Sequence, residues 1–254
     1  MTARRLALLT PLALLLIPQS ALAEEVSLGS RPVPVLLLLA ALSVLPFVLV
    51  MITSFVRIAV VLSILRSALG TPQVPPTMVI TGLAVVLSIY VMAPTGGKVL
   101  EAVRPALSSG AGQGLFSSAG ADALFDAASR AREPIREFLL RHSSARDRQL
   151  FVDLGRRMRP AAERGAVGER DLLVLVPAFV IGELTAAFRI GFVIFVPFLV
   201  IDMVVANLLL ALGMHMLSPT TVSLPFKLLL FVLVDGWRLL TQGLVLAYAA
   251  GGGP

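Results

Sequence analysis

Charged side chains lie inside or at the edges of long apolar runs in this sequence, where little water is available to hold them. A lone Arg, Lys or Asp at the middle of a bilayer costs roughly 2.5–3.5 kcal/mol by insertion scales. These residues must therefore pair with one another, or water must reach them. The residues concerned are Arg57, Glu183, Arg189, Asp202, Lys227 and Asp235.

We expect Glu183 and Lys227 to form an ion pair. A turn at Ser218-Pro219 brings their two apolar blocks antiparallel, but the residues lie 35 and 9 positions from that turn. Pairing along a bent helix and pairing between copies of the chain therefore both remain open. A further possibility is that each charge reaches a polar surface separately, along its own apolar stem.

Asp202 and Asp235 allow the interpretation that the chain is an intramembrane aspartyl protease, because two aspartates in membrane helices can form a catalytic dyad. Their contexts, Val-Ile-Asp-Met and Val-Asp-Gly-Trp, lack the Tyr-Asp and Gly-x-Gly-Asp motifs of intramembrane aspartyl proteases. Capping, or pairing with Arg189 and Arg238, is the simpler interpretation. The sequence offers no Ser/His/Asp set, metal cluster or nucleotide loop, so we expect no enzyme and no cofactor.

Met214, His215 and Met216 form a triplet directly before a Ser-Pro-Thr-Thr break. Methionine is flexible and apolar, and it usually packs into a core. Taken alone, the triplet therefore indicates ordinary packing at the end of a helix.

The composition indicates a membrane or membrane-derived protein. Of the 254 residues, 57% are hydrophobic and 14% charged, and the mean hydropathy is +0.92. Soluble domains contain about 25% charged residues. Of the 21 basic residues, 13 lie in Thr95–Asp171 together with 10 acidic ones, so that segment carries only +3. An interspersed surface of this kind does not favour nucleic-acid binding. The chain contains no cysteine and two histidines, too few to suggest a zinc site.

The pattern of residues 1–23 predicts a secretory signal peptide. Arg4 and Arg5 precede an apolar core, and Ala21-Leu22-Ala23 forms an A-x-A site with cleavage after Ala23. The apolar core is too short to cross the roughly 30 Å of hydrocarbon in a bilayer. An uncleaved first anchor is the alternative. Cleavage would leave the N-terminus outside the cytoplasm.

The remaining sequence predicts an all-α protein of four long apolar blocks kinked by proline. The first hairpin occupies residues 24–94, with a break at Pro46, a turn from Gly70 to Pro76 and an end at Pro94. Residues 95–171 predict a small polar helical domain outside the cytoplasm. There, Asp122 is expected to cap one helix, Pro134 to begin the next, and His142 to lie on the surface. A second hairpin with a pore-lining turn occupies residues 172–250, and residues 251–254 form a disordered tail.

Long motifs occur in a fixed order from Leu45 onward, covering most of the chain outside Ser108–Asp126 and the termini. They resemble the FliP/SctR family of type III secretion export-gate proteins. The first set comprises Leu45-Pro46-Phe47, Thr53-Ser54-Phe55-Val56-Arg57, Leu65-Arg66-Ser67-Ala68-Leu69-Gly70-Thr71, Gln73-Val74-Pro75-Pro76 and Val91-Met92-Ala93-Pro94. The second set comprises Phe151-Val152-Asp153, Val176-Pro177-Ala178-Phe179-Val180-Ile181-Gly182-Glu183-Leu184, Phe188-Arg189-Ile190-Gly191-Phe192, Pro197-Phe198-Leu199-Val200-Ile201-Asp202 and the segment from Ser223 to Trp237.

The resemblance implies a pore subunit for protein export and no enzymatic activity. Five copies would join FliQ/SctS-like and FliR/SctT-like subunits in a cone-shaped gate. That gate would lie on the periplasmic side of the bacterial inner membrane, within the basal body, and conduct unfolded proteins. The family's apolar hairpins pack largely between subunits, which would explain the embedded charges.

The resemblance also assigns residue roles. The family's buried glutamate and lysine, which pair within the gate, correspond to Glu183 and Lys227. Its methionine gasket, a ring that narrows the closed pore, corresponds to Met214, His215 and Met216. This sequence departs from the pattern because His215 replaces the usual middle methionine. Histidine changes charge near neutral pH, so a ring of five predicts a pH-sensitive constriction.

Two questions remain open from the sequence. The signal peptide is typical of flagellar members, whereas the Gln73–Pro76 turn and the segment Leu240–Leu244 look more like injectisome members, and we favour the injectisome. The alternative function is an ion-coupled membrane transporter that uses Glu183 and Lys227. Transporters usually carry internal repeats, and no repeat relates the two halves of this chain.

Overall fold

The computed structural model describes residues 32–71, 74–109 and 118–249. The predicted signal peptide with its cleavage site at Ala23 and the predicted tail at residues 251–254 lie outside the described residues. Across the described ranges the protein is all-α and contains no strand, as expected from its apolar blocks. Its helices are α2 (Pro32–Met51), α3 (Phe55–Leu69), α4 (Thr77–Ser109), α5 (Ser118–His142), α6 (Ala145–Arg157), the 3-10 helix η3 (Ala161–Ala166), α7 (Leu172–Ala211), α8 (Pro219–Leu233) and α9 (Gly236–Ala249).

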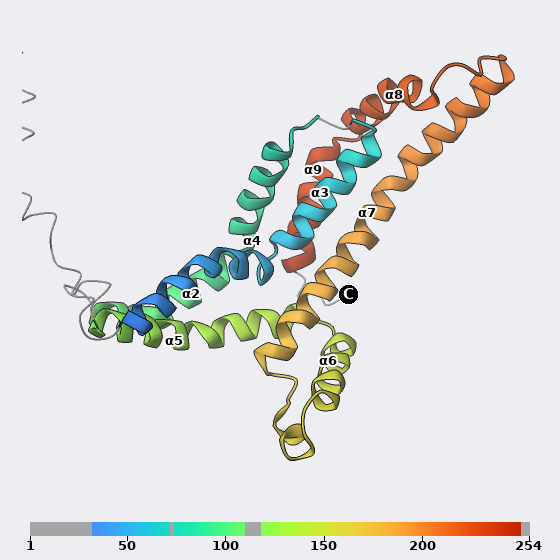
Figure 1. Ribbon diagram of the computed structural model, residues 1–254. Coiled ribbons are helices and arrows are strands. Elements are labelled where there is room, and N and C mark those ends of the chain that lie inside the picture. The colour runs from blue at the N-terminus through green and yellow to red at the C-terminus, as the bar shows by residue number, and fades with distance from the viewer. Residues whose placement is uncertain (1–31, 72–73, 110–117, 250–254) are drawn as a thin grey trace, which may run out of the picture.

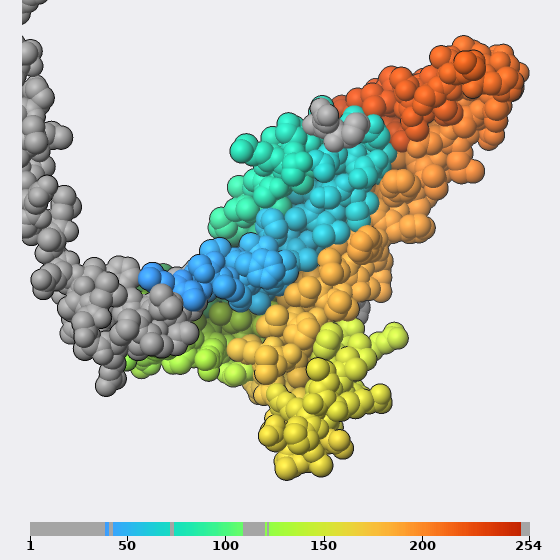
Figure 2. All heavy atoms as spheres, in the orientation of Figure 1, coloured from blue at the N-terminus to red at the C-terminus, as the bar shows by residue number. Residues whose placement is uncertain are grey.

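Helix α7 forms the long axis of the molecule (Figure 1). Its 40 residues would span about 60 Å at 1.5 Å per residue. Pro177 and Pro197 lie inside α7 without ending it. The end of α7 and helix α8 project together as an arm, and α6 with η3 bulges from the opposite end of the molecule (Figure 2).

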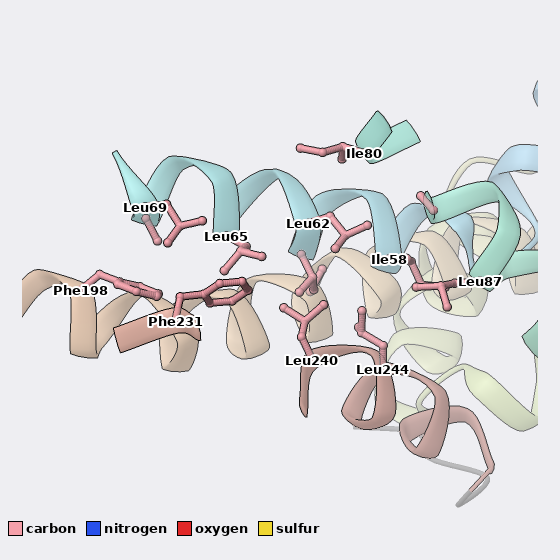
Figure 3. Packing of buried hydrophobic residues seen from close by; sticks show 14 residues of the cluster. Ile58, Leu62, Leu65, Leu69, Ile80, Leu87, Phe198, Phe231, Leu240 and Leu244 are labelled. Carbon is pink, nitrogen blue, oxygen red and sulfur yellow. The ribbon is translucent and has the colours of Figure 1, made fainter. Parts of the chain in front are cut away.

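The main core lies where α3 packs between α7 and α4, and α8 and α9 each add side chains to it. It contains Ile58, Leu62 and Leu65 of α3, together with Phe231, Leu240 and Leu244 (Figure 3). The side chains recur at spacings of three and four residues, so one face of each helix supplies the core. Gly191 allows the close approach of α7 to α3, because a Cβ there would lie 2.4 Å from Ile64 Cδ1.

The first apolar block breaks at Ile52–Ser54 rather than at Pro46, which lies inside α2. The axes of Ser43–Met51 and Phe55–Leu69 differ by 69°. Hydroxyl groups support this break: Thr53 donates to the carbonyl of Val50, and the buried Ser54 donates to Ser88 Oγ at 3.1 Å. Thr53 thus bonds the backbone at the break, and Ser54 joins the break to α4. Helix α3 ends at the predicted glycine turn, where Gly70 has a φ of 75°.

Helix α4 does not end at Pro94, as the sequence predicted, but continues through Gly96-Gly97 to Ser109. It changes direction near its middle, and its second half runs alongside α5 (Figure 1). A proline inside a helix removes one backbone hydrogen bond and kinks the helix. Packing against α5 stabilises the part of α4 that follows the kink. The same applies to Pro134, which lies inside α5, so the predicted separation into two helices at Pro134 is wrong.

The fourth apolar block is divided at Asp235, where α8 and α9 meet at 60°. Asp235 has a φ of 51°, and the backbone N–H groups of Val234 and Asp235 bond carbonyls of the last turn of α8. Gly236 is required there because a Cβ would lie 2.2 Å from a ring carbon of Phe231. The bend folds α9 back along the core.

Two of the described helices, α4 over Thr77–Ser108 and α7 over Leu172–Ala211, are long and apolar enough to cross a membrane. The bent pairs α2–α3 and α8–α9 raise the number of candidate spans to four if each pair counts as one.

Candidate functional site

The Met-His-Met triplet lies in the loop Leu212–Ser218, at the far end of the arm made by α7 and α8 (Figure 1). The N–H of Gly213 bonds the carbonyl of Leu210, and the N–H of Met214 bonds that of Leu209. These two bonds close α7 in a Schellman motif, and the φ of 71° at Gly213 suits glycine. The local sequence therefore stops α7 directly before the triplet.

The three side chains of the triplet point away from the packed core. His215 is exposed, Met214 is 42% exposed and Met216 is 98% exposed. Ser218 and Pro219 then begin α8, with proline at the first helical position. Ordinary core packing, the usual fate of methionine, is therefore not what these methionines do within one chain.

Lys227 anchors the base of this arm. Its Nζ lies 2.6 Å from Asp202 Oδ2 and donates to the carbonyl oxygen of Ala68 at 3.2 Å. Ser223 donates to the other carboxylate oxygen of Asp202. Ala68 belongs to the last turn of α3, so the ammonium stands at the negative end of that helix. One lysine thereby ties together α3, α7 and α8.

Glu183 lies in a second cluster, in the first half of α7. It is fully buried, and its Oε1 accepts a hydrogen bond of 2.7 Å from Arg57 Nη2 of α3. Its other oxygen accepts a hydrogen bond from the hydroxyl of Tyr248 of α9. The guanidinium of Arg57 also lies 4.5 Å from the centre of the Tyr248 ring, at cation–π distance. This cluster ties α3, α7 and α9 together.

His142 extends the second cluster to the polar domain. It is buried, so the prediction that it lies on the surface is wrong. Nδ1 lies 2.9 Å from the carbonyl oxygen of Phe138, and Nε2 lies 3.5 Å from that of Tyr248. Burial lowers the pKa of His142; the two carbonyl contacts partly oppose this, and the nearby positive charges of Arg57 and Arg141 add to it.

The predicted Glu183–Lys227 pair does not form within one chain, because each residue has another partner. The register of the helices explains this: α3 brings Arg57 to Glu183, and α8 places Lys227 beside Asp202, farther along α7. The predicted pairing of Asp202 with Arg189 is therefore also wrong. Pairing of Glu183 with Lys227 between copies stays a prediction.

The two remaining embedded charges are exposed. Arg189 lies on the outside of α7. Asp235 lies 3.9 Å from Arg238, which confirms their expected pairing as a loose, exposed contact. Among the residues that the structure describes, no group of three or more His, Cys, Asp or Glu side chains is placed to hold a metal ion.

Tyr248 and His142 are the partners that sequence reasoning missed. A tyrosine in an apolar helix has the pattern of a core residue, and only its hydroxyl signals a polar partner nearby. His142 does fall on the apolar face of α5 with Ile135, Phe138 and Leu139, which was the available signal for burial.

Comparison with known proteins gives a consistent result. The FliP family model matches residues 38–244. The chain is 45% identical over 208 residues to the hypersensitivity response secretion protein HrcR of Ralstonia nicotianae, covering 82% of this chain and 93% of the relative. It is 46% identical over 213 residues to the Yop proteins translocation protein R of Yersinia pestis, covering 84% and 94%. It is 42% identical over 220 residues to the flagellar biosynthetic protein FliP of Bacillus subtilis, covering 86% and 93%.

Proposed function

The chain belongs to the FliP family, and on that premise we propose that it is a core pore-forming subunit of a type III protein export gate. The gate conducts unfolded substrate proteins across the bacterial inner membrane. Relatives named for secretion, for translocation and for flagellar biosynthesis match at similar identity, so the proposal covers injectisome and flagellar systems alike.

The exposed tip of the arm is the observation that carries the pore proposal. Met214 and Met216 stand in solvent at the end of an apolar hairpin, although burying one methionine side chain is worth about 1.5–3 kcal/mol. A ring of such side chains from several copies would bury them against one another. Methionines are flexible and apolar, so the ring would exclude ions when closed and yield around an unfolded chain.

His215 places a titratable ring in the same loop. In a closed ring of five copies, protonation would bring like charges together and widen the constriction. The gate is therefore pH-sensitive in this proposal. Ion leak that stays identical from acidic to mildly basic pH, in wild type and in His215→Met, would contradict this part.

Assembly with other chains is supported by the outer face of α7. Large apolar side chains stay exposed along its second half, among them Phe192, Val200, Met203 and Leu208. Exposed apolar surface of this extent marks protein or membrane contacts. We propose that five copies, together with FliQ/SctS-like and FliR/SctT-like subunits, cover this face. The gate lies on the periplasmic side of the inner membrane, in the basal body, with the polar domain of residues 95–171 outside the cytoplasm.

Within this assembly the two charge clusters keep each copy rigid. The Arg57–Glu183–Tyr248 contacts join α7 to α3 and α9, and the Asp202–Lys227–Ala68 contacts join it to α3 and α8 farther along its length. Pairing of Glu183 with Lys227 of another copy would require exchange of these partners on assembly. Either arrangement holds the loop Leu212–Ser218 at a fixed position relative to α3.

The mass of the purified particle tests the proposal. Co-expressed with its export partners and extracted in detergent, the chain should appear in five copies per particle. Deletion of the gene should abolish secretion, and the wild-type chain should restore it. A monodisperse monomer or dimer, with secretion unaffected by deletion, would overturn the proposal.

An ion-coupled transporter has less support. Transport would need Glu183 or Lys227 to exchange ions with water, but Glu183 is fully buried and bound by Arg57 and Tyr248. Lys227 is also buried and is held by two oxygen atoms. We therefore retain the non-enzymatic export role.

A further inference from the structure

Arg189 has an unusual position among the charges embedded in the apolar helices. Glu183, Asp202 and Lys227 all have an ion-pair partner within the chain. In the part of the chain that the structure describes, the Arg189 side chain makes no ion pair or hydrogen bond, and it is exposed. A guanidinium in that position has its best partner in a carboxylate from outside this copy.

The surface around Arg189 is apolar. Phe188, Phe192 and Val193, one to four residues away on α7, are each more than 60% exposed. Residues three and four apart share one face of a helix. Arg189 is therefore a single positive charge on a face that otherwise needs an apolar cover.

Asp235 has the opposite charge in similar surroundings. Its side chain is 65% exposed at the break between α8 and α9, and its backbone is held at a φ of 51°. The contact with Arg238, at 3.9 Å between two exposed side chains, is worth little. The flanking Val232, Leu233 and Val234 are exposed as well. Asp235 is thus a single negative charge on a second apolar face.

Sequence neighbours of both charges line one apolar groove, although neither charge is part of its lining. This groove of about 530 Å³ is lined by Ile190 and Ile194, which follow Arg189, and by Val234 and Gly236, which flank Asp235. The two faces are different surfaces of one molecule, one on α7 and the other at the α8–α9 bend. Contact between two different surfaces of identical chains is heterologous, and it generates a ring or a helical stack.

We propose that Arg189 of one copy and Asp235 of the next copy form an ion pair across the interface between neighbouring subunits. This inference rests on the proposed function, because it requires several copies in one particle. It adds the contact surfaces and the direction of assembly: the α7 face of each copy lies against the α8–α9 bend of the next. The apolar residues around each charge cover one another and exclude water from the pair.

Cross-linking between differently tagged copies tests the inference. The chain contains no native cysteine, so only the introduced thiols can react. Val193→Cys in one copy and Val234→Cys in the other leave both charges intact and place a thiol beside each. A short bismaleimide should join the two tags. Leu208→Cys replaces Val193→Cys in the control, because it lies 15 residues farther along α7, about 22 Å away, and should give no product.

Charge neutralisation then shows whether the ion pair itself matters. Asparagine tolerates a positive φ, so Asp235→Asn removes the charge while preserving the bend. Arg189→Gln and Asp235→Asn should each reduce the cross-linked yield on the order of tenfold, and the double variant should reduce it no further.

The outcomes separate the inference from the proposed function. Three outcomes in a multi-copy particle overturn the inference alone. They are absence of the Val193–Val234 product, a product in which the thiol is joined to a protein of different mass, and additive losses of yield in the double variant. Absence of any multi-copy particle overturns the proposed function as well.

Discussion

Arg57 and Tyr248 together bind both oxygen atoms of the buried Glu183 side chain. We predict that Arg57→Met, which keeps the length and loses the charge, destabilises the protein by about 3–5 kcal/mol, because it leaves a buried carboxylate without a cation. Thermal unfolding in detergent measures this effect.

The matched control is Arg130→Met, which removes an exposed arginine paired with Asp126 at 2.9 Å. Exposed pairs of this type are worth about 0–1 kcal/mol. Equal stability of the two variants would show that the Arg57–Glu183 pair does not hold the fold.

His142 predicts a pH dependence of stability. Burial lowers the pKa of His142 in the folded protein below its ordinary value of 6.5. The unfolded chain therefore binds the proton first as pH falls, and folding opposes protonation. The contribution of neutral His142 is complete above pH 6.5 and declines as pH falls below it, until the folded pKa is reached.

Thermal unfolding between pH 8 and pH 5 in wild type and His142→Gln measures this contribution. The wild type should lose more stability than the variant below pH 6.5, by at most about 1.4 kcal/mol per pH unit. Parallel curves for the two proteins would contradict the assignment.

At the scale of single residues, the expected need for a partner holds for Arg57, Glu183, Asp202 and Lys227, but not for Arg189, which is exposed and unpaired in the described part of the chain. The positions of Glu183 and Lys227 in apolar runs were sufficient to predict that they need partners. The choice of Arg57 and Asp202 depends on the register of α3 and α8 against α7, which local sequence does not encode. Tyr248 was missed because its ring packs as a core residue while its hydroxyl binds Glu183.

At the scale of elements, the α8–α9 bend depends on one glycine. We predict that Gly236→Ala destabilises the fold by about 1–3 kcal/mol, because the added Cβ would overlap the Phe231 ring and force that ring or the bend to move. Gly243→Ala on α9 is the control, since no neighbouring atom would lie within 4 Å of the methyl group that it adds. That change should be neutral or stabilising, because alanine favours a helix more than glycine does. A larger loss from Gly243→Ala than from Gly236→Ala would contradict this account of the bend.

The tip loop carries the prediction about pore closure. Shortening both methionines in the double variant Met214→Ala/Met216→Ala should raise ion leak through the assembled gate several-fold, because the proposed ring would lose the side chains that close it. Assembly should persist, since neither side chain packs in the core of its own chain. Conductance of the purified complex in a planar bilayer measures the leak.

Met158→Ala is the control for this test, because Met158 is also strongly exposed but lies in the polar domain. Unchanged conductance in the tip variant, or an equal rise in the Met158 variant, would show that the tip loop does not close the pore.

The existence of helices was predictable from apolar periodicity, whereas their ends were not. Pro94 and Pro134 signal helix ends, yet both lie inside helices, because α4 and α5 pack along each other over these positions. The break at Thr53-Ser54 was missed because Thr53, whose hydroxyl bonds the backbone on both sides of the break, resembles an ordinary small helix residue in sequence. Gly70 and Gly213, by contrast, end α3 and α7 in the left-handed conformation that glycine accepts at low cost.

At the scale of the whole molecule, large apolar side chains stay exposed along α7 in addition to those that fill the core. Such an exterior is expected of a chain whose outer face is completed by other proteins or by lipid.

Cysteine labelling distinguishes cover by proteins from cover by lipid. Val200→Cys lies on the exposed face of α7 and, in the unassembled chain in detergent, should react with a water-soluble maleimide. In the assembled particle it should be strongly protected, because a neighbouring subunit excludes the reagent and the water that a thiolate needs. Met158→Cys, in the polar domain, should react in both states. Equal labelling of Val200→Cys in the particle and the free chain would mean that no neighbouring subunit covers this face. The apolar helices would then be ordinary membrane spans, and the charges within them would need a different explanation.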